Sequence, residues 1–231
     1  MSREAVEDRL HPKGAAGLPA AYGALKCLGI AATGPRLEPG RPVPHAGILY
    51  RWKKTEIRLF ELHDHHKLRD EPARTGVGYV WVEPPIAPER LRLVANRARL
   101  VYQRNQQNGV PYGFGYRTSC FDEHGGPRLG DGEIGFTCAT IVAAILEAEK
   151  VSILDPTTWP PADASDIETR RKYLEHLKAN DAAHAKLLEA DIKSPRISPE
   201  EVVAAAAIHP PSATFESVQD GAAVVRGRIG T

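Results

Sequence analysis

The sequence predicts an α+β fold: a small antiparallel sheet packed on a helix that begins with a cysteine, with a helical extension at the C-terminus. Two runs of strand-forming residues, 45–52 and 57–63, flank a short polar turn, as in a β-hairpin. Paired prolines end a third run, GVGYVWVEPP, which indicates another strand. Periodic apolar positions predict helices over 88–107 and from Cys138 to about Lys150.

The other segments carry weaker patterns. The N-terminal part is rich in Gly, Pro and Ala, and we expect a short helix near 17–28 followed by loop. Residues 64–75 are highly charged and are expected to form a loop, and 110–135 is a long glycine-rich loop of the kind that usually has a function. After a proline-rich exit, the pattern predicts a polar helix over 166–190, a second helix over 198–208 and a mixed tail.

Composition excludes several classes of protein. The chain has 231 residues and a formal net charge of +1, which argues against a nucleic-acid partner, because such domains usually carry a basic excess. The three cysteines are widely spaced and form no CxxC pair, so neither a disulfide framework nor a zinc ribbon is expected. This cysteine usage fits a reducing compartment.

No targeting segment is expected either. No apolar run approaches the ~20 residues that a membrane span needs. The first residues include acidic side chains and no continuous apolar stretch, unlike a secretory signal. We therefore expect a cytoplasmic protein without a membrane span, and export by a signal-independent route stays open.

Cys138 lies at the first turn of an apolar helix. A helix N-terminus presents unpaired N–H groups and a partial positive charge, which lower the pKa of a thiol placed there. The alternative is a buried small hydrophobe, since free cysteine is often buried. A catalytic thiol would also need a base and a group that orients this base.

The predicted hairpin supplies such partners. His45 begins the first strand, and Glu61 and His63 share a face near the end of the second. Because a hairpin places the start of one strand beside the end of the other, His45 is expected to lie next to Glu61 or His63. Both remain candidates for the group that fixes the tautomer of His45.

Other reactive side chains receive structural interpretations. The histidine-rich stretch 63–70 is expected to be a solvated strand end and charged loop rather than a metal site, because it matches neither the HxHxDH nor the HExxH pattern. Tyr112 and Tyr116 flank glycines upstream of Cys138 and are candidates to line a substrate site. Cys120 is assigned a structural or substrate-loop role, and Cys27 is expected to be packed in the fold.

The order His, acid, Cys resembles the circularly permuted branch of the NlpC-like papain superfamily, especially its YiiX/YebB-like group, with lecithin:retinol acyltransferase as a more distant relative. The resemblance covers roughly 38–165. The matching motifs, in chain order, are PHAGI (44–48), LFEL (59–62), YVWVEPP, PYGFGY and FTCATIV (136–142).

This resemblance implies a permuted papain-like catalytic domain over 38–165, between an N-terminal segment (1–37) and a helical extension (166–231). It implies a cysteine hydrolase without a cofactor that cleaves an amide in a peptide or peptidoglycan-type substrate. Cys138 would be the nucleophile and His45 the base. The alternatives are a lipid acyltransferase or thioesterase that takes an acylated substrate, and a catalytically silent module. In either case the C-terminal helices could bind a partner protein.

Overall fold

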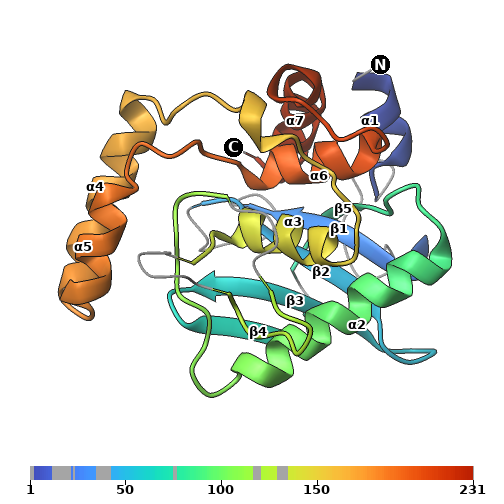
Figure 1. The fold of residues 1–231 in the computed structure, drawn as a ribbon. Helices are drawn as coiled ribbons and strands as arrows, with labels where there is room; N and C mark the ends of the chain where they lie inside the picture. Colours follow the sequence, from blue (N-terminus) through green and yellow to red (C-terminus); the bar gives the residue numbers. More distant parts are fainter. Residues whose placement is uncertain are drawn as a thin grey trace.

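The computed structural model describes residues 3–11, 22, 24–34, 43–74, 77–116, 121–128 and 135–230. Over these residues the fold is α+β, as predicted, with seven α-helices and one antiparallel sheet of strand order β4–β3–β2–β1–β5 (Figure 1). The strands are β1 (Leu28–Thr33), β2 (His45–Arg51), β3 (Ile57–Asp64), β4 (Lys67–Pro72) and β5 (Val80–Val82). The helices are α1 (Arg3–Arg9), α2 (Pro88–Asn105), α3 (Cys138–Ala148), α4 (Ala164–Lys178), α5 (Ala182–Ala190), α6 (Pro199–Ile208) and α7 (Phe215–Ile229), with a short 3-10 turn at Pro156–Thr158.

The predicted hairpin is confirmed as β2 and β3. Its turn closes through a hydrogen bond in which Trp52 N donates to Glu56 O at 2.9 Å. The two strands pair from Arg51 with Ile57 to Ile48 with Phe60. The alternation of side chains therefore places one set of β2 and β3 residues against the helices and the other set on the opposite face of the sheet.

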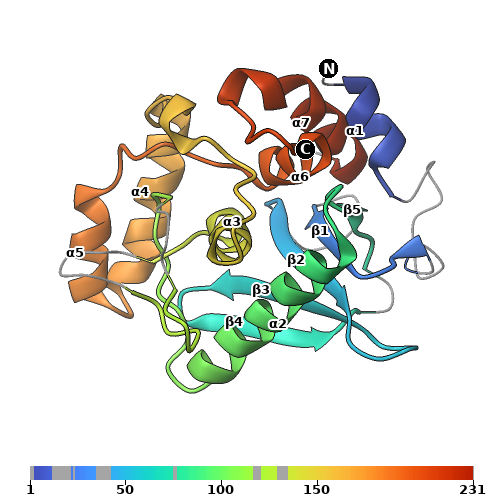
Figure 2. The same ribbon diagram turned by 45° about the vertical axis from the view of Figure 1, so that its right-hand side comes forward.

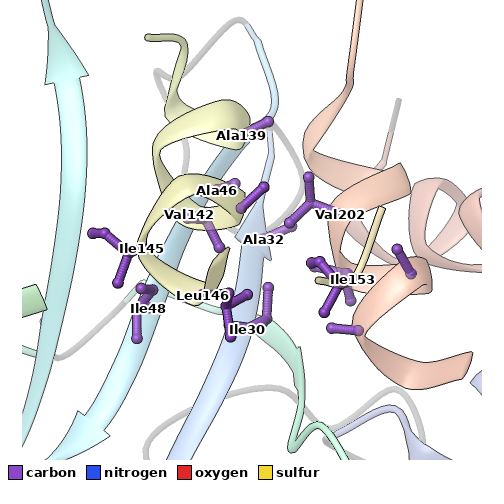
Figure 3. Packing of buried hydrophobic residues seen from close by; sticks show 14 of the residues in the cluster. Ile30, Ala32, Ala46, Ile48, Ala139, Val142, Ile145, Leu146, Ile153 and Val202 are labelled. Atoms are coloured by element: carbon purple, nitrogen blue, oxygen red, sulfur yellow. The ribbon is translucent and has the colours of Figure 1, made fainter. Parts of the chain in front are cut away.

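The main core lies between the sheet and α3. In Figure 3, Val142, Ile145 and Leu146 of α3 face Ile30 and Ile48 of the neighbouring strands. All side chains of α3 from position 139 to 146 are at most 1% exposed. This helix is apolar all round, which is the pattern of a helix enclosed on every side.

The C-terminal region divides into two differently packed parts. Helix α6 packs on β1, β2, β5 and α3, and every one of its residues is buried. Helix α7 packs on α6 and α1. Helices α4 and α5 instead pack on each other and lie to one side of the sheet in both views (Figures 1 and 2). The predicted three-part division stays a prediction, but α6 shares the main core with the sheet and α3.

Four predictions about secondary structure were wrong. The loop expected after residue 28 contains β1; the helix predicted near 17–28 lies largely outside the described residues and is not one of the four. The charged segment predicted to be a loop contains β4 (Lys67–Pro72), an edge strand, and charged residues on such a strand disfavour pairing with other chains. The helix predicted over 166–190 is interrupted between α4 and α5, and the mixed tail contains α7.

The helices of the described residues were compared with the length and apolar character of a membrane-spanning helix. Among these residues, no helix has the length and the apolar character that crossing a membrane requires.

Candidate active site

The site lies where β2 and β3 separate. Their ladder ends at the pair Ile48–Phe60, although β2 begins at His45 and β3 continues to Asp64. Helix α3 contacts both strands, and Figure 2 shows its ribbon between the start of β2 and the end of β3. The N–H of Ala46 is not used in the ladder with β3 and donates to the Cys138 sulfur instead.

Cys138 is the first residue of α3, as predicted. Thr137 caps the helix: its Oγ1 accepts from Thr140 N at 3.0 Å, and Thr140 Oγ1 accepts from Thr137 N at 2.7 Å. This reciprocal cap occupies two of the N–H groups that a helix start leaves unpaired. The N–H groups of Cys138 and Ala139 remain without an acceptor in the helix, directly beside the thiol.

His45 lies between the thiol and a carboxylate. Its Nε2 is 3.2 Å from Glu61 Oε2, and its ring is hydrogen-bonded to Cys138. With Nε2 directed at Glu61, Nδ1 is the ring nitrogen that remains for the sulfur. His45 is 7% exposed and Glu61 2% exposed, so this contact is shielded from water.

The electrostatics favour a thiolate and an imidazolium. Burial lowers the pKa of His45, but the charge and hydrogen bonds of Cys138 and Glu61 outweigh it and raise that pKa to about 9. Burial raises the pKa of the Cys138 thiol, but the charge and hydrogen bond of His45 and the N–H of Ala46 bring it below its ordinary value. The two shifts share one cause, which is the mutual attraction of the thiolate and the imidazolium.

Glu61 is the centre of a wider charge cluster. Its Oε1 lies 3.5 Å from His63 Nδ1, 3.2 Å from Arg74 Nη2 and 3.6 Å from Arg69 Nη1. The ring of His63 lies edge-on to that of His45, with centroids 5.8 Å apart. Of the two predicted partners, Glu61 is the one whose carboxylate forms an ion-pair contact with His45, and the more exposed His63 contacts the same carboxylate.

A cavity of about 230 Å³ opens above the thiol. Tyr112 and Phe114 form one wall, and Arg170 and Tyr173 of α4 form another. The remaining lining residues are Val43, Pro44, Thr137, Cys138, Ala139, Asp166, Thr169, Arg196, Ile197 and Pro199. The sulfur is therefore reachable by a ligand of limited size.

Gly135 helps to position the cavity wall that Tyr112 and Phe114 form. Its φ of +95° is in the region that favours glycine, and a Cβ at this position would lie 2.0 Å from Pro111 O. The close approach allows Phe136 N to donate to Pro111 O at 3.1 Å. Segment 111–114 is thereby held beside the residues that lead into Cys138, which places Tyr112 at the cavity.

The other predicted residues lie elsewhere. Tyr116 lines a neighbouring hollow with Asp191 and Ser194 rather than the cavity above the thiol. Its role in substrate binding stays a prediction. Cys120 falls outside the described residues. Cys27 is partly buried against the main core, and burial raises the pKa of its thiol, in contrast to Cys138.

Several residues of the site were not predicted. Arg69 and Arg74 belong to the segment interpreted as a loop, and strand alternation would have placed Arg69 opposite Glu61 had that strand been recognised. Arg170 and Tyr173 come from α4, and Arg196 from the chain before α6. No local pattern indicates that these distant segments meet at the thiol.

Within the described part of the chain, two clusters have donor atoms close enough together for a metal ion: His45, Glu61 and His63, and separately His65, His66 and Asp181. In the first, the guanidinium groups beside Glu61 would repel a cation. In the second, His65 Nδ1 accepts from Tyr112 N at 3.2 Å, so the proton of a neutral ring is on Nε2, the nitrogen that faces Asp181. Neither donor set fits a metal well.

Comparisons with protein-family models, with curated proteins and with solved structures give no match to this chain. The resemblance to the permuted papain-like group therefore stays a prediction.

Proposed function

We propose that the protein is a cysteine hydrolase that cleaves an amide bond through an acyl-enzyme. The observation that carries this proposal is the contact of Cys138 with His45 and of His45 Nε2 with Glu61 at 3.2 Å. A nucleophile, a base and a group that orients the base are the three parts that nucleophilic catalysis of acyl transfer requires.

The residues divide the reaction between them. The Cys138 thiolate attacks the substrate carbonyl carbon, and the carbonyl electrons move to oxygen. When the tetrahedral intermediate collapses, the C–N bond breaks and the His45 imidazolium gives its proton to the leaving amine. Neutral His45 then takes a proton from water as the water attacks the thioester. The second collapse releases the carboxylic acid product and restores the thiolate and imidazolium.

The start of α3 also offers a place for the developing oxyanion. The N–H of Cys138 lies on the attacking residue itself, and the N–H of Ala139 follows it in the same turn. Both are free of intrahelical acceptors, and the helix end adds a partial positive charge. Preorganised donors of this kind stabilise charge that appears only in the transition state.

The cavity favours an amino-acid-sized acyl group over a long lipid chain. Its volume of about 230 Å³ is below the roughly 300–1,000 Å³ of typical ligand pockets. A long acyl chain would exceed this volume. The lipid acyltransferase therefore remains the weaker of the two enzyme candidates.

Trapping of the acyl-enzyme tests the proposal. A panel of short peptide amides, esters and thioesters is offered to the intact protein, and intact-mass spectrometry after an acid quench measures covalent addition. We expect an acyl adduct on Cys138 that disappears in Cys138→Ala. Cys27→Ala is the matched control and should retain the adduct. Addition to Cys27 or Cys120 in the folded protein would refute the assignment, and absence of any adduct or turnover across the panel would favour the silent module.

A further inference from the structure

The cavity above Cys138 carries a positive charge that the proposed hydrolysis does not use. Its charged lining residues, apart from the thiol, are Asp166, Arg170 and Arg196. Among the side chains that line the cavity, the two guanidinium groups outnumber the one carboxylate, while Glu200 and Glu201 of α6 act on Arg196 from outside the lining. An anionic group on the substrate would be attracted to such a cavity, and a cationic group repelled.

Arg170 contributes this charge mainly as part of the wall. It is 5% exposed, and its Nη1 donates to Ile192 O at 2.8 Å and to Ser194 O at 2.6 Å. Its guanidinium also lies 4.8 Å from the centre of the Phe114 ring. These contacts fix the side chain and hold the chain after α5 against α4.

Arg196 is differently placed. Its Nη1 is 2.6 Å from Asp166 Oδ1, and its side chain is 53% exposed. Among the described residues, no hydrogen-bond acceptor is found for its Nε and Nη2 atoms. The ion pair with Asp166 thus fixes one arm of the guanidinium at the cavity and leaves the other donors available.

We infer that the acyl group of the substrate carries a carboxylate, which Arg196 binds while the carbonyl carbon lies at the Cys138 sulfur. This inference rests on the proposed function and names the class of its substrate. A planar carboxylate matches the paired donors of a guanidinium. The aromatic side chains of Tyr112, Phe114 and Tyr173 would pack on the short carbon chain between the two ends.

Alkylation of the thiol by two small reagents tests the charge preference without any need for turnover. Iodoacetate and iodoacetamide both lose iodide as the thiolate forms a C–S bond, but only iodoacetate carries a carboxylate. Rates at Cys138 are measured by peptide mass spectrometry at low salt, and the ratio of the iodoacetate rate to the iodoacetamide rate cancels general changes in thiol reactivity.

We expect opposite effects from the two members of the ion pair. Arg196→Gln should lower the rate ratio about threefold to fivefold, the size of a partly exposed charge interaction. Asp166→Asn should raise the ratio, because it removes the negative charge that competes for Arg196. Arg92→Gln, on the exposed side of α2, is the control and should leave the ratio unchanged.

The outcomes separate this inference from the proposed function. Rapid alkylation of Cys138 with the same ratio in all four proteins would overturn the carboxylate site and leave the hydrolase proposal intact. Alkylation of Cys138 no faster than that of Cys27 with either reagent would overturn the hydrolase proposal, and the inference with it. A ratio that falls in Arg196→Gln and rises in Asp166→Asn supports both.

Discussion

The two walls of the cavity are held in different ways. The thiol side belongs to α3, whose residues 139–146 are enclosed by the sheet, α2 and α6. The opposite side belongs to α4, which packs mainly on α5. Moving the thiol would disturb the main core, whereas moving the opposite wall would not.

The α4–α5 hairpin has a small core of its own. Its buried members are Leu174, Leu177, Ala185 and Leu188, which pack on Phe114. Polar contacts attach the hairpin to the rest of the protein: Tyr173 Oη donates to Asp64 Oδ1 at 3.3 Å, His184 Nε2 lies 2.7 Å from Tyr112 O, and Gly115 N donates to Asp191 Oδ2 at 2.9 Å.

The chain enters and leaves this hairpin at one point, since Ala162 N donates to Lys193 O at 3.2 Å. The comparison suggests a division of labour. In the proposed reaction, the reacting groups lie on the enclosed elements, whereas the part of the cavity wall formed by Asp166, Arg170 and Tyr173 lies on a smaller unit that is attached at its edges.

The largest effect is expected at the base. His45→Gln removes the imidazolium that stabilises the thiolate and protonates the leaving amine, so kcat/KM should fall by about 10²–10⁴-fold. The fall in kcat/KM is measured by steady-state kinetics on the substrate that the acyl-enzyme panel identifies. Circular dichroism checks that the variant is folded. Activity within twofold of wild type would remove His45 from the mechanism.

The next largest effect is the loss of turnover expected when the α4–α5 hairpin is removed as a unit. Replacement of residues 163–192 by a Gly-Gly link should leave a chain that unfolds cooperatively and retains rapid alkylation of Cys138, because the ends already lie together. Turnover should be lost with the substrate-selecting wall. A chain that no longer folds would show that the hairpin belongs to the main core and would contradict the comparison.

A smaller effect is expected at Glu61. Glu61→Gln removes the carboxylate beside His45 and leaves the positive charges of Arg69 and Arg74, so the pKa of His45 should fall. A decrease of one unit corresponds to about tenfold in its protonation ratio, and we expect a loss of kcat/KM of about that size. His63→Gln is the matched variant. A greater loss in His63→Gln than in Glu61→Gln would make His63 the third member of the site.

The smallest effects are expected on stability, when one buried side chain is shortened in each wall of the cavity. Ile145→Ala in α3 should lower the global free energy of unfolding by about 2–5 kcal/mol, because it opens a cavity in the main core. Leu188→Ala in α5 should change global stability less and raise KM, with faster hydrogen exchange confined to α4 and α5. Equal increases in exchange throughout both variants would show a single cooperative core.

The candidate catalytic residues could be predicted because their signals are local. A cysteine at the start of an apolar helix and a histidine at the start of a strand are visible in short windows of sequence. Alternation along the second strand then places Glu61 and His63 on one face. The surrounding charges were missed because β4 has the composition of a loop, and its buried Asp70 is stabilised by contacts with Tyr50 and Arg58 from other strands.

Tertiary packing explains why β1 and α7 were not predicted from the sequence. In β1, Gly29 and small alanines give little strand signal, but a Cβ on Gly29 would lie 2.9 Å from Trp81 Cε3, so close strand packing requires glycine. In α7, Gly221 weakens the helical pattern, yet a Cβ there would lie 2.7 Å from Val6 Cγ2 of α1. In both places tertiary contact outweighs local preference.

The pH dependence of Cys138 alkylation by iodoacetamide tests the central claim most directly. In wild type, the His45 imidazolium persists up to its pKa of about 9 and lowers the pKa of the thiol, so the reactive thiolate should be present well below the ordinary thiol pKa of about 8.5. In His45→Gln the rate should rise only as pH passes through that ordinary value or above it. Wild-type and His45→Gln profiles that coincide would contradict the thiolate–imidazolium pair.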